Sequence, residues 1–270
     1  VTKLGISKIR LTGGEPLVRE DFPYLVQKLS LIQGIQDLSM TTNGVLFSLF
    51  AKDLKKAGLK RVNISLDSLK PDRYKTITRT GNLKDVLDGV ESALRMGFDP
   101  VKINTVIIDD INVDEIKDLI LLTKEWNISI RLIELMPFGK FAFSNPPFVD
   151  SEKLLERFFP PDEIQPSDVY GFGPARYFKL KGAKGSIGII TSQSKNFCYG
   201  CNKLRLTADG KIRPCLFSDL ELDFLSLLRD SATKDEKMAK LFEKATNIKP
   251  KERLQGSRCT RVKALSSIGG

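Results

Sequence analysis

Three of the four cysteines in the chain lie close together, with the spacing C-x2-C-x13-C. Cys198 and Cys201 are two thiols that a single tight turn can present to one metal. The pair Asp209-Gly210 predicts a hairpin turn, which would return Cys215 toward them on the second arm. Zinc requires a fourth ligand, and so in most cases does an iron–sulfur cluster. The stretch therefore predicts a metal site whose fourth position is either filled by Cys259 or left open for a substrate.

Two cations follow the cysteine pair directly. Lys203 and Arg205 would point to the same face of an extended strand, beside the metal. A structural zinc has no need of these charges, whereas a substrate that bears phosphate does. A structural zinc and simple buried thiols remain the alternatives. The chain has no histidine, which excludes Ser-His-Asp and Cys-His hydrolases and every histidine-ligated metal site.

The composition is that of an ordinary globular protein with a basic balance. Its 270 residues are 41% hydrophobic and 28% charged, and Lys+Arg 43 against Asp+Glu 33 gives a net charge of +10. This excess indicates either a well-solvated basic surface or an anionic partner such as a nucleotide or nucleic acid. No stretch is apolar enough to span a membrane. Four cysteines are too few for a disulfide scaffold, and their clustering favours metal in a reducing compartment.

Short apolar runs alternate with helical patterns in the first half of the chain. This alternation is typical of βαβ units around a parallel sheet. Asn112, with Glu115 three residues later, resembles a capping box at the start of a helix. The predicted strands cover 8–11, 37–41, 61–65, 101–107 and 128–135, and the predicted helices cover 22–32, 47–57, 74–78, 83–96 and 113–126.

Small or polar residues follow each of these strands, and ligands of parallel sheets bind at the carboxyl ends of strands. In the turn after the first strand, Gly13 and Gly14 allow close approach of a ligand to the backbone, and Glu15 can bind an ammonium group. Ordinary turn chemistry would explain each strand end alone. Arg10 and Lys102 lie within strands, where a cation indicates either a bound anion or a side chain that extends to solvent.

The character of the sequence changes after residue 139. The second half predicts a helix over 151–159, a hairpin from strands 176–180 and 185–191, the cysteine hairpin, helices over 222–228 and 235–246, and a basic tail. We therefore expect two regions, residues 1–140 and 141–270.

With these residues assembled, the chain resembles the molybdenum-cofactor biosynthesis protein A family, the radical S-adenosylmethionine GTP 3′,8-cyclases. The resemblance implies an α/β fold, a partial (β/α)6 TIM-like barrel of the radical S-adenosylmethionine type, followed by a C-terminal region with an auxiliary [4Fe-4S] cluster. It extends from end to end and rests on RLTGGEP at 10–16, TTNG at 41–44, NISLDSL at 63–69, PVKIN at 100–104, IELMPFG at 133–139, FCYGCNKLRLTADG at 197–210, CLF at 215–217 and the terminal Gly269-Gly270.

The resemblance also implies roles for individual residues. The auxiliary cluster would be bound by Cys198, Cys201 and Cys215, with its open iron facing the guanine base. S-adenosylmethionine would contact Gly14, Glu15, Ser65 and Met136. GTP would contact Arg10, Thr41, Lys102, Lys203, Leu204 and Arg205. The tail residues Gly269 and Gly270 would project into the active site and take part in catalysis.

The implied reaction is the first step toward cyclic pyranopterin monophosphate. A 5′-deoxyadenosyl radical removes the 3′ hydrogen of GTP, and the sugar radical attacks C8 of guanine. The protein would supply position and electrostatics. The resemblance further implies a homodimer, no nucleic-acid or membrane partner, and a downstream cyclic pyranopterin monophosphate synthase. The compartment would be the cytoplasm in bacteria or archaea and the mitochondrial matrix in eukaryotes.

The chain departs from the family pattern in two places. No cysteine precedes residue 198, so the family's N-terminal C-x3-C-x2-C, which binds the cluster that cleaves S-adenosylmethionine, is absent. The chain also starts too late for the family's first βα unit. We therefore expect an N-terminally incomplete copy that cannot start radical chemistry by itself. Position 203 is Lys where the family usually has Arg, which provides charge without a bidentate fork.

Other classes of protein are conceivable. A peptide-modifying radical enzyme would carry more C-terminal cysteines. A basic zinc-binding module for nucleic acid would leave the GGEP turn and the Gly-Gly tail without a role. An inactive paralogue or fragment would keep the fold without the activity. Cys259 has no role here beyond that of a spare thiol.

Overall fold

The structure is a computed structural model, and it describes residues 2–136, 148–169, 173–195, 198–230 and 234–250. The main elements are the strands and helices β1 Lys8–Leu11, α1 Phe22–Ser30, β2 Asp37–Thr42, α2 Phe47–Lys56, β3 Arg61–Ser65, α3 Pro71–Thr78, α4 Leu83–Arg95, β4 Val101–Ile107, α5 Ile116–Glu125, β5 Ile128–Glu134, α7 Ser151–Phe158, β6 Ile164–Pro166, β7 Arg176–Leu180, β8 Ser186–Ile190, β9 Arg205–Leu206, β10 Lys211–Arg213, β11 Leu222–Asp223, α8 Leu225–Arg229 and α9 Lys234–Asn247. Short 3-10 turns lie at Thr2–Leu4, Pro16–Val18, Val113–Glu115, Pro161–Glu163 and Cys198–Gly200.

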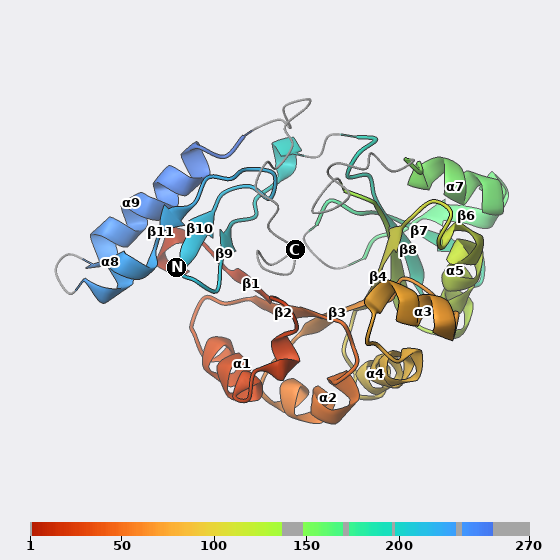
Figure 1. Ribbon diagram of the computed structural model, residues 1–270, viewed down its shortest axis with the longest axis horizontal. Coiled ribbons are helices and arrows are strands. Elements are labelled where there is room, and N and C mark those ends of the chain that lie inside the picture. The colour runs from red at the N-terminus through yellow and green to blue at the C-terminus, as the bar shows by residue number, and fades with distance from the viewer. Residues whose placement is uncertain (1, 137–147, 170–172, 196–197, 231–233, 251–270) are drawn as a thin grey trace.

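A single sheet of eight strands forms the framework. Its order is β1-β2-β3-β4-β5-β8-β7-β6, with β1 to β5 and β8 parallel and with β7 and β6 antiparallel. Helices α1 to α5 lie on the outer side of the curved sheet (Figure 1). The predicted partial (β/α)6 barrel is therefore confirmed, because six parallel strands curve without closing into a ring in the described part of the chain. The sheet continues past residue 140, and the division into two regions near that point stays a prediction.

The two faces of this sheet differ in polarity because side chains alternate along each strand. The outer face packs against the helices and forms the core. It consists mainly of Leu38, Met40, Val62, Ile64, Val101, Ile103, Ile130, Leu132, Ile187 and Ile189, all at most 2% exposed. Each fully buried aliphatic side chain stabilises the fold by about 1.5–3 kcal/mol. The opposite face, called the inner face below, is lined by polar side chains.

A small second sheet holds the cysteine stretch. Strand β10 pairs antiparallel with both β9 and β11. The predicted turn between β9 and β10 is confirmed: Gly210 adopts a positive φ of 76°, the N–H of Thr207 donates to the carbonyl of Lys211, and the N–H of Lys211 donates to the hydroxyl of Thr207. In Figure 1 this sheet lies beside β1 together with α8 and α9. An ion pair from Lys3 to Asp235 of α9 joins the same two parts of the molecule.

Two local predictions were wrong. The predicted helix over 222–228 begins only at Leu225, because Leu222 and Asp223 pair with β10 as a strand. The predicted capping box does not form. The Asn112 side chain accepts from the N–H of Ile108 and donates to the carbonyls of Asp67 and Val106, so it binds the preceding loops rather than the helix. Its partner Glu115 is fully buried and binds the 68–70 loop instead.

No helix in the described ranges is both long and apolar enough to cross a membrane.

Candidate functional site

Two rows of polar side chains cross the inner face of the sheet. The strand register places Thr41 next to Asn63, Asn63 next to Lys102, and Lys102 next to Ser129. One step toward the carboxyl ends, a second row holds Ser65, Asn104, Arg131, Gly188 and Tyr177. Residues of several strands thus meet on one surface although neighbours in the two rows are 11 to 57 residues apart in sequence.

Five positive side chains gather at this surface and are called the cation cluster: Arg10, Lys102, Arg131, Lys203 and Arg205. Lys102 is 2% exposed. Its pKa is lowered to about 7 by burial and then by the charges of Arg131, Arg61 and Arg10, with only partial compensation from Asp37. Burial followed by the charge of Arg10 lowers the pKa of Lys203 to about 8. The structure therefore brings the predicted cations of the strands and of the cysteine stretch together.

Arg131, which is 6% exposed, also belongs to the cation cluster and was not identified from the sequence. One of its terminal nitrogens donates to the side-chain oxygen of Asn63 at 2.9 Å, whereas its Nε is buried without a hydrogen-bond acceptor. Burial lowers the pKa of Arg131 to about 10. A buried donor that lacks an acceptor is costly, so a ligand oxygen at this position would stabilise the site. The signal was present, since Arg131 is a cation within an apolar strand, as Arg10 and Lys102 are.

Tyr177 is a second functional residue that the sequence did not reveal. Its hydroxyl accepts a hydrogen bond from Nζ of Lys102 at 3.0 Å and another from Arg131. Gly188, its cross-strand neighbour, makes room for the ring, because a Cβ there would lie 2.8 Å from the Tyr177 ring and 2.9 Å from Cγ of Arg131. Nothing local identified Tyr177, because its position depends on β7 joining the same sheet as β4.

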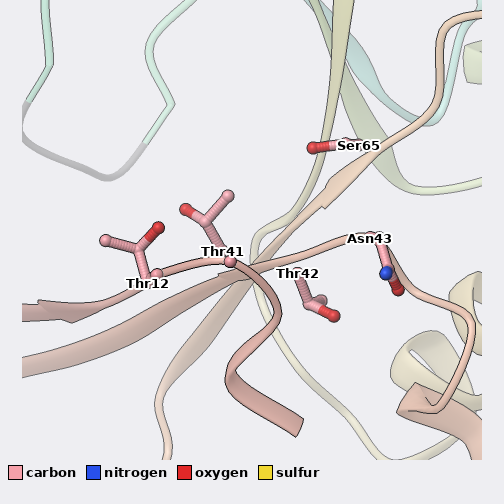
Figure 2. A pocket seen from close by; sticks show the side chains of 7 residues that line it. Thr12, Thr41, Thr42, Asn43 and Ser65 are labelled. Carbon is pink, nitrogen blue, oxygen red and sulfur yellow. The ribbon is translucent and has the colours of Figure 1, made fainter. Parts of the chain in front are cut away.

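A pocket of about 170 Å³ lies at the carboxyl ends of the first three strands and is lined by Gly14, Thr41 and Ser65, among others. Figure 2 shows Thr12 and Thr41 pointing to one side of the strands, with Ser65 on that side, while Thr42 points to the other. Three residues predicted to contact substrate or cofactor are thus brought together. Met136, also predicted, is half-buried just beyond β5.

Glu15 is fixed beside this pocket by the chain itself. Its carboxylate accepts hydrogen bonds from the N–H of Leu17 at 3.1 Å, from the Thr42 hydroxyl at 2.7 Å and from the N–H of Asn43 at 2.7 Å. These bonds join the turn after β1 to the end of β2. A carboxylate can accept more than three hydrogen bonds, so Glu15 keeps capacity for an ammonium group.

Asp67 lies at the next strand end and was not among the predicted residues. Its carboxylate accepts a hydrogen bond from the N–H of Val106 at 2.7 Å. Burial nonetheless raises its pKa to about 6. A carboxylate with a raised pKa at the mouth of a site is a frequent mark of function.

The cysteine stretch contributes thiols and cations to the same region. Burial raises the pKa of Cys201, but the N–H of Lys203 and the ammonium of Lys249 more than offset it, so that the net change is downward. Arg205 interacts electrostatically with both Cys201 and Cys215, and its Nε is buried without an acceptor. Within the described ranges, no three Cys, His, Asp or Glu side chains converge closely enough to hold a single metal ion. Leu204 is half-buried between its two cationic neighbours.

Glu134 connects this stretch to the main sheet. It is fully buried at the end of β5. Its carboxylate accepts hydrogen bonds from the N–H groups of Gln193 and Ser194 at 2.8 and 2.9 Å and from the hydroxyls of Ser194 and Ser151 at 2.7 and 3.1 Å. The chain that leads to Cys198 is therefore fixed to the same strand that carries Arg131. The predicted residues Gly269 and Gly270, and Cys259, lie outside the described residues.

Comparison with known proteins gives matches along nearly the whole chain. Residues 1–123 match the Radical SAM superfamily, and residues 128–254 match the family described as Molybdenum Cofactor Synthesis C. The chain is 48% identical over 267 residues to the GTP 3′,8-cyclase of Moorella thermoacetica, covering 98% of this chain and 82% of that protein. It is 44% identical over 268 residues to the GTP 3′,8-cyclase of Thermodesulfovibrio yellowstonii, covering 99% and 82% respectively.

Proposed function

Because the chain belongs to the molybdenum-cofactor biosynthesis protein A family, the radical S-adenosylmethionine GTP 3′,8-cyclases, we propose that its inner face binds GTP for cyclisation between C3′ and C8. The cation cluster is the observation that supports this most directly. Its members lower one another's pKa, so the empty surface is electrostatically unfavourable. A triphosphate would relieve that repulsion, since charge-assisted hydrogen bonds to phosphate are among the strongest that proteins make.

The triphosphate would be bound by Arg10, Lys102, Lys203 and Arg205, with Thr41 and Leu204 beside it. Arg131 joins this set because its Nε has no acceptor and its neighbour Lys102 shares the same hydroxyl of Tyr177. On binding, the two cations would exchange the phenol oxygen of Tyr177 for phosphate oxygens. A buried site excludes water, so these interactions are stronger there than at the surface.

S-adenosylmethionine would lie at the neighbouring strand ends. Gly14 and Ser65 line the pocket there, Met136 follows β5, and Glu15 would accept from the methionine ammonium group. Membership in the radical S-adenosylmethionine superfamily implies a [4Fe-4S] cluster together with this cosubstrate. When bound, they supply the radical that starts the reaction, but the sequence has no cysteine before residue 198 to hold that cluster. The residues named here would therefore only orient the two substrates.

Cys198, Cys201 and Cys215 would bind an auxiliary [4Fe-4S] cluster. The donor set fits, because thiolates are the usual ligands of such clusters. Two thiols lie near Arg205, whose buried Nε has no acceptor and suits an anionic group. In a cluster each thiolate binds a different iron, so the three sulfurs need not converge on one ion. The iron without a cysteine would face the guanine base, and Gly269 and Gly270 would complete the site.

Further elements of the proposal concern the chain as a whole. We retain the division at residue 140, a homodimer, and delivery of the product to a cyclic pyranopterin monophosphate synthase. A reducing compartment, the cytoplasm in a bacterium or archaeon, suits thiols that bind iron. A zinc-binding nucleic-acid module is not favoured, because the two relatives reported above are named as cyclases.

Titration calorimetry with GTP tests the proposal. We expect Lys102→Met and Arg131→Met to weaken GTP binding at pH 7 by at least about tenfold each, the loss typical of one charge-assisted bond. Lys124→Met, on the exposed side of α5, is the matched control and should bind as the wild type does. Full GTP affinity in both inner-face variants would refute the assignment. Bound zinc in place of iron after anaerobic reconstitution would refute the cluster.

A further inference from the structure

Lys249 connects the two arms of the cysteine hairpin. It follows the end of α9, and its ammonium donates to the carbonyl of Lys203 on the first arm and to the carbonyl of Pro214 on the second, the latter at 3.3 Å. Lys203 is two residues beyond Cys201, and Pro214 directly precedes Cys215. One side chain therefore binds the backbone beside two of the three cysteines, although 46 and 35 residues separate it from these partners.

The same ammonium also donates a hydrogen bond to the sulfur of Cys201. A lysine ammonium has three N–H donors, and the two carbonyls and the sulfur use all of them. Lys249 is half-buried, so water screens these contacts only in part. The backbone N–H of Lys203 donates to the same sulfur. Two N–H donors, one from Lys203 and one from Lys249, therefore contact the sulfur of Cys201.

We propose that Lys249 is a positioning residue of the cysteine site, which closes the hairpin around the metal group and places a positive charge on the Cys201 ligand. This inference rests on the proposed auxiliary cluster. Hydrogen bonds to sulfur and nearby charge set the reduction potentials of iron–sulfur clusters. A positive charge stabilises the more negative, reduced form, so Lys249 raises the reduction potential of the group bound there.

A purely structural role for Lys249 makes a different prediction. If it served only to attach α9 to the hairpin, its loss would lower the stability of the protein and leave the reduction potential unchanged. Lys249→Met keeps the length of the side chain and removes the charge and the donors. Lys249→Arg restores the charge. Lys244→Met, on the exposed face of the last turn of α9, is the matched control.

The test is a redox titration of the anaerobically reconstituted chain, followed by electron paramagnetic resonance. The signal of this site is the one lost in a Cys201→Ser variant. We expect Lys249→Met to shift the midpoint potential downward or to lose the cluster while the circular dichroism stays native, Lys249→Arg to recover most of the difference, and Lys244→Met to match the wild type. A wild-type potential and iron content in Lys249→Met would overturn the inference alone. A wild-type chain without any signal that depends on Cys201 would overturn the proposed function.

Discussion

Raising the pH from 7 to 9 should weaken the binding of GTP, because Lys102 loses its proton in the ligand-free protein. Its pKa there is about 7, compared with an ordinary value of 10.5. A triphosphate bound beside Nζ favours the ammonium form and returns the pKa toward the ordinary value. Binding above pH 7 therefore requires the uptake of a proton, and each further unit of pH makes that uptake less favourable.

The size of the effect follows from these two pKa values. At pH 8 about nine-tenths of the Lys102 side chains are neutral in the empty protein, so binding should take up about 0.9 proton at this residue. Between pH 7 and pH 9 the affinity should fall roughly 25- to 50-fold, for a pKa in the complex between about 9 and 10.5. Burial is the largest cause of the low starting pKa, followed by the charges of Arg131 on β5, Arg61 on β3, Arg10 on β1 and Asp37 on β2. The hydroxyl of Tyr177 on β7 is the hydrogen-bond partner of Nζ.

Calorimetry measures the proton uptake directly. The apparent binding enthalpy at pH 8 is compared in two buffers with different ionisation enthalpies. Lys203 also contributes, since its pKa is about 8, so the diagnostic quantity is the difference between the wild type and Lys102→Met. That difference should be about 0.9 proton, because Met cannot titrate. Equal uptake by the two proteins, or a wild-type affinity that is constant from pH 7 to 9, would refute the reasoning.

Three further substitutions test the surroundings of the site. Gly188→Ala should displace the Tyr177 ring and weaken GTP binding while costing about 1–3 kcal/mol of stability. An unchanged GTP affinity by calorimetry and an unchanged thermal unfolding curve would show that the space beside Gly188 accommodates a methyl group. Glu134→Gln removes the charge that the N–H groups of residues 193 and 194 bind, and should lower the free energy of unfolding by about 1–3 kcal/mol, with faster amide exchange of those two residues; exchange as slow as in the wild type would contradict this. Asp67 has a raised pKa, so it stabilises the fold below about pH 4, and this contribution is lost as the pH rises to about 6. Asp67→Asn should therefore reduce the loss of stability between pH 4 and pH 6.5 by on the order of 1–2 kcal/mol. Urea unfolding measures this loss, and curves that do not change between the two pH values in either protein would argue against the prediction.

Local patterns were sufficient to predict the first half of the framework. The apolar runs at 61–65 and 101–107 are strands with the predicted bounds, because burial of one face requires the alternation that the sequence displays. The same logic found Arg10 and Lys102, since a cation inside a strand is conspicuous. It would also have found Arg131, whose strand was predicted without attention to the charge within it.

Long-range pairing could not be predicted in this way. Tyr177 belongs to the site only because β8 joins β5 in parallel and β7 then pairs back along β8. The hairpin of β7 and β8 was predicted, but its attachment to β5 has no local signal. Lys249 reaches the cysteine hairpin from a distant helix. The capping box at Asn112 failed for the reverse reason: the local motif was present, but tertiary partners bound both of its side chains.

Insertions and deletions should be tolerated very unevenly along this chain. Each polar row takes one residue from each of several strands, and the chain between them passes around a helix at the surface. A longer connection, for example around 31–36, would leave Thr41, Asn63 and Lys102 in place. One residue gained or lost inside β4 would instead exchange its two faces, placing the charge of Lys102 among the helices and Ile103 on the inner face. Variation in length is therefore expected in the connections, and the strands should keep a fixed number of residues.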